Sequence, residues 1–129
     1  MSKVLIVEDN ADLLGILKDL LSRDYVVFTA RTGEDAINLA EREKPDAVIL
    51  DLQLPAMDGM EAGRWIKTKL APQRVAILVL TALAGAGDAE AILNSGCCDA
   101  YMAKPAPLSA IKAKIVELLG QPSYQVGLA

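Results

Sequence analysis

The sequence alternates five times between a short apolar run and a longer stretch in which apolar residues recur at helical spacing. The helical spacing is illustrated by Leu13, Leu17 and Leu21, which follow one another at intervals of four residues. The five apolar runs are residues 4–7, 26–29, 47–50, 75–80 and 100–103. Strands covered by helices on both faces of a parallel sheet are almost continuously apolar, as the first, third and fourth runs are. The alternation therefore predicts an α/β fold built from five βα units.

Five units are too few for a closed barrel, which needs eight, so we expect an open, doubly wound five-stranded parallel sheet in three α/β/α layers. Thr32, with Asp35 three residues later, predicts the start of the second helix. Gly96 predicts the end of a fourth helix that starts near Asp88. The length of 129 residues fits one domain, which we place at residues 1–120. Residues 121–129 are predicted to be a C-terminal tail or the start of a linker.

Charge and apolar run length exclude several classes of partner. The net charge is −4, the sequence pI is about 4.8 and the basic residues are scattered, so we expect no direct nucleic acid binding and no membrane binding. The longest apolar stretch, residues 75–86, is shorter than the roughly 20 residues of a membrane-spanning helix. The N-terminal segment lacks the layout of a signal peptide. We therefore predict a cytoplasmic protein.

The sequence contains no histidine, which excludes Ser-His-Asp and Cys-His catalysis, histidine-ligated zinc and a role as phosphohistidine donor. Its two cysteines, Cys97 and Cys98, are adjacent, so an ordinary disulfide between them is sterically disfavoured. We expect both thiols to be reduced.

Polar, reactive residues follow four of the five predicted strands. Glu8 and Asp9 follow the first strand, Asp51 the third, Thr81 the fourth, and Lys104 the fifth. The carboxyl ends of parallel strands lie at one edge of a sheet, where ligands bind in open α/β folds. The sequence therefore predicts a functional site at this edge.

Three of these side chains are carboxylates that should repel one another. Two like charges about 4 Å apart repel by roughly 4 kcal/mol at an effective dielectric constant of about 20. A divalent cation among Glu8, Asp9 and Asp51 would remove this repulsion, and Mg²⁺ suits a site with few carboxylates and a phosphate oxygen. The alternative is that Glu8 and Asp9 only stabilise the start of the first helix through its dipole.

Four segments in this order resemble the CheY-like receiver domains of bacterial response regulators, over residues 3 to about 119. The segments are residues 4–10, residues 51–59, Thr81-Ala82 and residues 101–105. The resemblance implies a flavodoxin-like (βα)5 fold and a role in two-component signalling. It also implies that the chain is a signalling phosphoacceptor, which promotes its own phosphorylation and dephosphorylation, rather than an enzyme.

The resemblance further implies roles for the residues at the sheet edge. Asp51 is the phosphoacceptor, and Lys104 contributes a positive charge to the phosphoryl group. Asp9, Asp51 and the backbone carbonyl of Gln53 bind Mg²⁺, for which Mn²⁺ can substitute, and Glu8 acts through a coordinated water. Lys104 is followed by a proline, and the bond between them is cis in similar domains.

A switch is also implied. Thr81 senses the phosphoryl group, and Tyr101 swings inward when Thr81 and the loop after it move. The output surface would be the fourth helix, fifth strand and fifth helix, where a homodimer is possible. The implied partners are a sensor histidine kinase or histidine phosphotransfer protein, and a downstream protein or effector domain.

Two features of the sequence bear on this resemblance. Gln53 and Leu83 occupy positions that set the phosphoryl lifetime in similar domains, and neither can act as a base, so we expect a long-lived phosphoryl group. The segment from Gly96 to Lys104 is one residue longer than usual because of the cysteine pair, which leaves the shape of that turn open.

Three alternatives remain. A haloacid-dehalogenase-type phosphatase would need a second carboxylate where Gln53 stands. A flavodoxin would need a phosphate-binding first loop, which residues 8–12 contradict by their charge. A receiver-like interaction module that works without phosphorylation would need none of the polar residues at the sheet edge.

Overall fold

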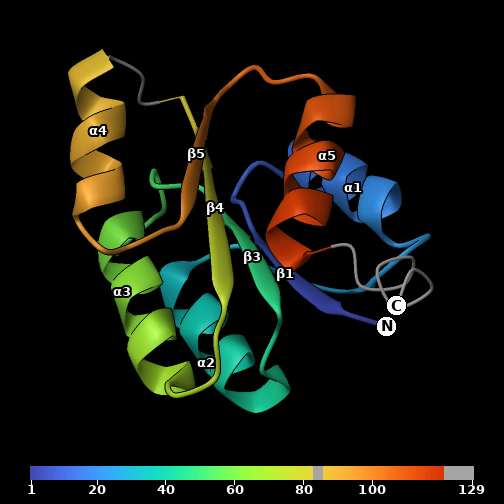
Figure 1. Cartoon of the computed structure of the whole chain (residues 1–129), viewed down its shortest axis with the longest axis horizontal. Helices are drawn as coiled ribbons and strands as arrows, with labels where there is room; N and C mark the ends of the chain where they lie inside the picture. Colours follow the sequence, from blue (N-terminus) through green and yellow to red (C-terminus); the bar gives the residue numbers. More distant parts are fainter. Residues whose placement is uncertain (83–85, 121–129) are drawn as a thin grey trace.

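Strands and helices alternate along the whole of the computed structural model, which describes residues 1–82 and 86–120 (Figure 1). The strands are β1 Lys3–Val7, β2 Val26–Ala30, β3 Ala47–Leu50, β4 Ala76–Thr81 and β5 Ala100–Ala103. The helices are α1 Ala11–Leu21, α2 Gly33–Glu43, α3 Gly59–Leu70, α4 Ala86–Asn94 and α5 Leu108–Leu119. Within residues 1–82 and 86–120, none of the helices is long and apolar enough to cross a bilayer.

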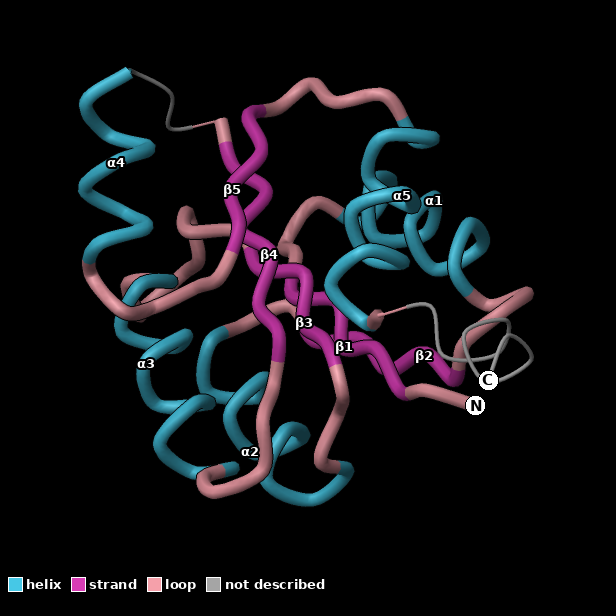
Figure 2. Tube along the Cα trace, viewed as in Figure 1, coloured by secondary structure: helices cyan, strands magenta, loops and turns pink. Residues whose placement is uncertain are grey.

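The five strands form one parallel sheet in the order β2-β1-β3-β4-β5. Figure 2 shows the sheet as the middle layer, with α1 and α5 on one side and α2, α3 and α4 on the other. The predicted doubly wound, three-layer α/β/α fold is confirmed. The strand order changes direction at β1, which pairs with β2 on one side and β3 on the other.

Successive side chains of the central strands point to opposite faces of the sheet and so belong to two separate cores. On β1, Val4 and Ile6 pack with α1 and α5 in one cluster, while Leu5 and Val7 pack with α2, α3 and α4 in the other. All four side chains are buried. This two-sided burial explains why the strands read as unbroken apolar runs.

Local capping interactions fix where several helices begin and end. The Thr32 side chain accepts a hydrogen bond from the Asp35 amide at 3.1 Å and caps α2, as predicted. The Asn10 side chain caps α1 in the same way, by accepting from the Leu13 amide at 3.0 Å. Gly96 follows α4 with a φ of 81°, a left-handed conformation that glycine adopts without steric cost.

Several element boundaries differ from the sequence prediction by one or two residues, and two of these differences concern the site and its neighbouring helix. Thr81 is the last residue of β4 rather than the residue after it, because the ladder to β5 continues through a pair between Thr81 and Ala103. Helix α4 begins at Ala86 rather than near Asp88. Asp88 then lies in the first turn of α4, where a carboxylate interacts favourably with the helix dipole.

The turn that carries the additional residue folds into the interior. Cys97 and Cys98 are both buried and are free thiols. The Asp99 carboxylate accepts hydrogen bonds from the Ile77 amide and from the Lys67 ammonium, each at 2.8 Å. These contacts fasten the turn to β4 and α3, and β5 pairs with β4 in parallel register after it.

Candidate functional site

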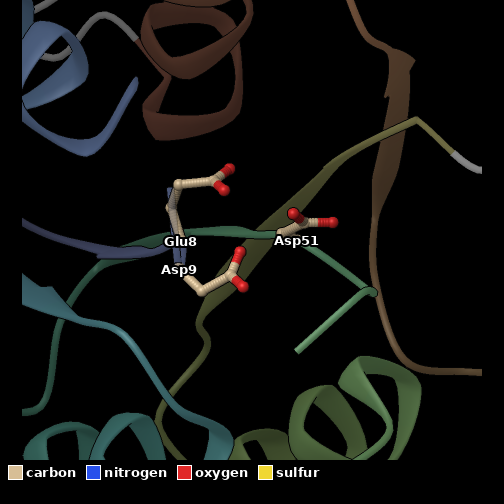
Figure 3. A group of neighbouring side chains, drawn as sticks. All are labelled: Glu8, Asp9 and Asp51. Carbon is tan, nitrogen blue, oxygen red and sulfur yellow. The ribbon is translucent and has the colours of Figure 1, made fainter. Parts of the chain in front are cut away.

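Three carboxylates meet at the carboxyl edge of the sheet. Glu8 and Asp9 follow β1, and Asp51 follows the neighbouring strand β3 (Figure 3). One oxygen from each carboxylate lies within 4.8 Å of the other two. The site thus lies beside the point where the strand order changes direction, the usual ligand-binding position in open α/β sheets. The predicted convergence of these three residues is confirmed.

The three carboxylates differ in exposure. Glu8 is 2% exposed and Asp51 is 4% exposed, whereas Asp9 is exposed to solvent. A buried carboxylate loses its hydration, so it needs hydrogen bonds or an opposite charge to remain ionised. The site therefore has a buried part, formed by Glu8 and Asp51, and an open side at Asp9.

Lys104 supplies the opposite charge. Its Nζ atom lies 2.7 Å from Glu8 Oε1 and 3.0 Å from Asp51 Oδ2. The peptide bond between Lys104 and Pro105 is cis, as the resemblance implied. The ammonium bridges two carboxylates that follow different strands, and this bridge joins the ends of β1 and β3 to the segment after β5 in one ionic network.

Main-chain amides complete the hydrogen bonding of the two buried carboxylates. The Asn10 amide donates to Glu8 Oε2 at 3.1 Å, and the Gln53 amide donates to Asp51 Oδ1 at 3.0 Å. Among the described residues, no buried side-chain nitrogen or oxygen lacks a hydrogen-bond partner. The carboxylates are consequently held in fixed orientations.

The environment changes the protonation behaviour of two groups in the site. Burial raises the pKa of Glu8 above its ordinary value, and the opposing effect of the hydrogen bond from Lys104 does not cancel this rise. Burial also disfavours the charged form of Lys104, but its hydrogen bonds to Glu8 and Asp51 outweigh that effect and raise its pKa. Lys104 is therefore a permanent cation near neutral pH.

The arrangement of donors fits a hard divalent cation. All three side chains offer carboxylate oxygens, which Mg²⁺ prefers, and their spacing allows one ion to contact more than one of them. Exposure of Asp9 leaves one side open to solvent, which suits an ion that retains several waters. We conclude that Glu8, Asp9 and Asp51 could hold Mg²⁺.

Gly59 allows the loop after β3 to turn back tightly beside Asp51. A Cβ atom at this position would lie 2.4 Å from the Leu52 Cα atom and 2.6 Å from the Asp51 carbonyl oxygen. The Gly59 amide donates to the Leu52 carbonyl oxygen at 3.1 Å. The close approach requires glycine, because any side chain would displace the backbone next to the candidate phosphoacceptor.

The structure places the remaining predicted site residues as follows. Thr81 is fully buried at the end of β4, and its carbonyl oxygen accepts a hydrogen bond from the Lys104 amide at 2.9 Å. Tyr101 is half-buried on β5 and packs against the core beneath α2, α3 and α4. The Gln53 carbonyl belongs to the loop after Asp51. Leu83 lies outside the described residues.

Two contacts in the site were not predicted from the sequence. One is the pairing of Lys104 with Glu8, since the resemblance implied only that Lys104 contributes a positive charge to the phosphoryl group. The other is Arg31, whose Nη2 atom donates to the Asp9 carbonyl oxygen at 2.7 Å. The sequence gives one indication that Arg31 could lie near the site. Arg31 directly follows Ala30, the last residue of β2, so it lies at the carboxyl ends of the strands like the other site residues.

Comparison with known proteins identifies a family and relatives that cover most of the chain. The sequence model of the response regulator receiver domain matches residues 4–116. The polar-differentiation response regulator DivK of Brucella anthropi is 34% identical over 118 residues, which are 91% of this chain and 95% of that protein.

Solved structures resemble the fold closely. The receiver domain of a sensor histidine kinase from Pseudomonas aeruginosa, which has a magnesium ion coordinated in its active-site cleft, superposes with a TM-score of 0.81 and 34% identity over 92% of this chain and 98% of that chain. A CheY-like response regulator receiver domain protein from Methanospirillum hungatei gives a TM-score of 0.84 and 26% identity over 97% of this chain and 98% of that chain.

Proposed function

The chain belongs to the response regulator receiver family, and from that premise we propose that it accepts a phosphoryl group on Asp51 in a Mg²⁺-dependent reaction. The phosphoryl donor would be a sensor histidine kinase or a histidine phosphotransfer protein. The observation that supports this function best is the cluster itself, in which a buried, ionically paired Asp51 lies beside two further carboxylates and a lysine.

The Asp51 carboxylate is the nucleophile. One of its oxygens attacks the phosphorus of a phosphohistidine, so that an O–P bond forms while the N–P bond breaks. The imidazole nitrogen retains the bonding electrons and takes up a proton from solvent. The hydrogen bond from the Gln53 amide to Oδ1 orients the carboxylate for this attack.

Glu8, Asp9, Asp51 and the backbone carbonyl of Gln53 would hold the cation, with Glu8 acting through a water. When bound, Mg²⁺ supplies positive charge that offsets the negative phosphoryl oxygens, and Mn²⁺ would substitute for it. The Pseudomonas receiver domain, with magnesium in its active-site cleft, supports this assignment.

Lys104 and Thr81 respond to the modification. An acyl phosphate carries its negative charge on the phosphoryl oxygens, so the Lys104 ammonium would turn from Oδ2 of Asp51 to one of these oxygens. The Thr81 hydroxyl would donate to another. Its movement at the end of β4 would allow Tyr101 on β5 to move inward and alter the surface of α4, β5 and α5.

This chain would therefore be a phosphorylation-controlled signalling protein rather than an enzyme that turns over a free substrate. The α4–β5–α5 surface would bind a downstream protein, an effector domain or a second copy of the chain. We place the protein in the cytoplasm, where kinase and phosphotransfer partners would reach it, and expect residues 1–120 to act as one domain.

The proposal is tested by incubating the chain with acetyl phosphate and Mg²⁺ and measuring the intact mass. The wild-type mass should rise by one phosphoryl group, and Asp51→Asn or omission of Mg²⁺ with EDTA present should abolish the rise. Labelling of Asp51→Asn equal to that of wild type would contradict the assignment. Gln53 and Leu83 lead us to expect that the label, once formed, decays over minutes or longer rather than seconds.

A further inference from the structure

We propose that Arg31 is a positioning residue for the cation site, because its guanidinium holds the main chain of Asp9 so that the Asp9 carboxylate stays beside Glu8 and Asp51. This inference rests on the proposed function, since it concerns the same cation. The inference assigns a role in cation binding to a residue that follows β2 and does not itself coordinate the cation.

Asp9 is the least supported of the three carboxylate residues. Glu8 and Asp51 are buried, and each receives a main-chain hydrogen bond and the Lys104 ammonium. Asp9 is exposed and lies in the short segment between β1 and α1. A ligand in such a segment contributes to affinity only if its backbone is held in place before the cation arrives.

Arg31 provides this support through the Asp9 carbonyl group. Its Nη2 atom lies 2.7 Å from the Asp9 carbonyl oxygen, a short, charge-assisted hydrogen bond. Arg31 contacts the main chain, so the Asp9 side chain keeps its orientation toward the other carboxylates (Figure 3). The guanidinium therefore acts on the position of the ligand rather than replacing the cation.

The backbone of Arg31 is itself fixed on both sides. The carbonyl oxygen of Ala30, the preceding residue, accepts a hydrogen bond from the Glu8 amide at 3.0 Å. The next residue, Thr32, caps α2. Arg31 thus starts from a rigid position at the carboxyl end of β2, next to β1, and this limits the conformational entropy lost when its side chain bridges to Asp9.

A positioning role and a purely electrostatic role of Arg31 predict opposite changes in cation affinity when Arg31 is replaced by glutamine. If Arg31 acted only through its charge, it would repel the cation, and Arg31→Gln would tighten binding by about two- to threefold at physiological salt. If Arg31 holds Asp9 in place, Arg31→Gln should weaken binding by about tenfold, the lower end of the range for groups that orient metal ligands.

The experiment measures Mn²⁺ affinity from the electron paramagnetic resonance signal of the free ion, and Mg²⁺ affinity by competition. The proteins are the full-length wild type, Arg31→Gln, Arg31→Lys and Arg74→Gln. Arg74 is exposed and precedes β4 at the opposite edge of the sheet, so its variant loses the same charge far from the site. Thermal unfolding in EDTA checks that each variant is folded.

We expect Arg31→Gln to bind about tenfold more weakly, Arg31→Lys to bind with intermediate affinity because it retains a donor, and Arg74→Gln to match wild type. Tighter or unchanged binding by Arg31→Gln, with Arg31→Lys equal to wild type, would overturn the inference and leave the proposed function standing. If wild type itself bound neither ion saturably, the proposed function and the inference would both be wrong. If Arg31→Gln were unfolded, Arg31→Lys alone would decide, with wild-type affinity as the overturning result.

Discussion

At the scale of single residues, the ionic network depends on Lys104, which is the only lysine or arginine within 4.0 Å of the Glu8 or Asp51 carboxylates in the described part of the chain. Its ammonium holds these two groups together when no divalent ion is bound. A bound cation would neutralise the same carboxylates, so Lys104 and the cation both reduce the repulsion between Glu8 and Asp51.

Substitution of Lys104 by methionine should make the stability of the domain depend more strongly on the bound cation. We expect Lys104→Met to lose about 2–3 kcal/mol of unfolding free energy in EDTA, since two nearly buried carboxylates would face each other without a cation. Mg²⁺ should restore more stability to this variant than it adds to wild type. Urea unfolding with and without Mg²⁺ measures both effects.

Lys114→Met is the matched control for that substitution. Lys114 pairs with Glu117 on the exposed surface of α5, so its loss should change the unfolding free energy by less than about 0.5 kcal/mol. Equal losses in the two variants would show that the Lys104 network has no special weight.

The raised pKa of Glu8 predicts a pH dependence in the metal-free protein. Because burial raises this pKa, the folded chain binds more protons than the unfolded chain between the two pKa values. The resulting stability is fully present below the ordinary pKa and is lost as pH rises through the folded pKa. The stability of Glu8→Gln relative to that of wild type should therefore increase as pH rises above about 4.5.

Urea unfolding of both proteins in EDTA over a series of pH values from about 4.5 upward measures this difference. Glu8→Gln keeps the size of the side chain and cannot titrate, so it isolates the contribution of the carboxyl group. A stability difference that stays constant, or that shrinks as pH rises, would contradict the predicted direction.

At the scale of elements, the loop between β3 and α3 controls the position of Asp51. Gly59→Ala should cost about 1–3 kcal/mol of unfolding free energy, because its Cβ atom would meet backbone rather than a flexible side chain. The displaced loop should also slow labelling by acetyl phosphate. Thermal or urea unfolding and the mass assay measure the two effects.

Gly15→Ala is the same chemical change as Gly59→Ala, but we expect it to raise the free energy of unfolding rather than lower it. Gly15 lies within α1, and no neighbouring atom lies within 4 Å of a Cβ atom at this position. Alanine should add about 0.5–1 kcal/mol of stability because it favours the helix. A loss for Gly15→Ala similar to that of Gly59→Ala would show that backbone contact does not explain the difference.

At the scale of the whole molecule, one sheet joins two cores, so we expect the domain to unfold cooperatively. Cys97 and Cys98 lie in the core beneath α2, α3 and α4, and their thiols are nearly inaccessible. In urea, their reaction with Ellman's reagent should follow the same transition as the loss of helical circular dichroism. Thiol reaction at clearly lower urea would show that the turn before β5 opens independently.

The sequence by itself determined the elements and the set of polar residues at the sheet edge. Alternating runs such as residues 47–50 and the Leu13, Leu17, Leu21 spacing are local patterns, since they arise from which residues each strand or helix must bury. The Thr32 cap is local for the same reason. The sequence also predicted that Glu8, Asp9 and Asp51 lie close together, because the carboxyl ends of parallel strands lie at one edge of the sheet.

Only the tertiary structure decided which of these groups touch. Lys104 reaches Glu8 across 96 residues and Asp51 across 53, and Arg31 reaches Asp9 across 22. Such pairs depend on strand order and on the reach of each side chain, and apolar periodicity specifies neither. The same holds for Gly59, whose necessity comes from the backbone packed against it. Residue patterns encode what must be buried, whereas the packed chain alone fixes which charges become neighbours.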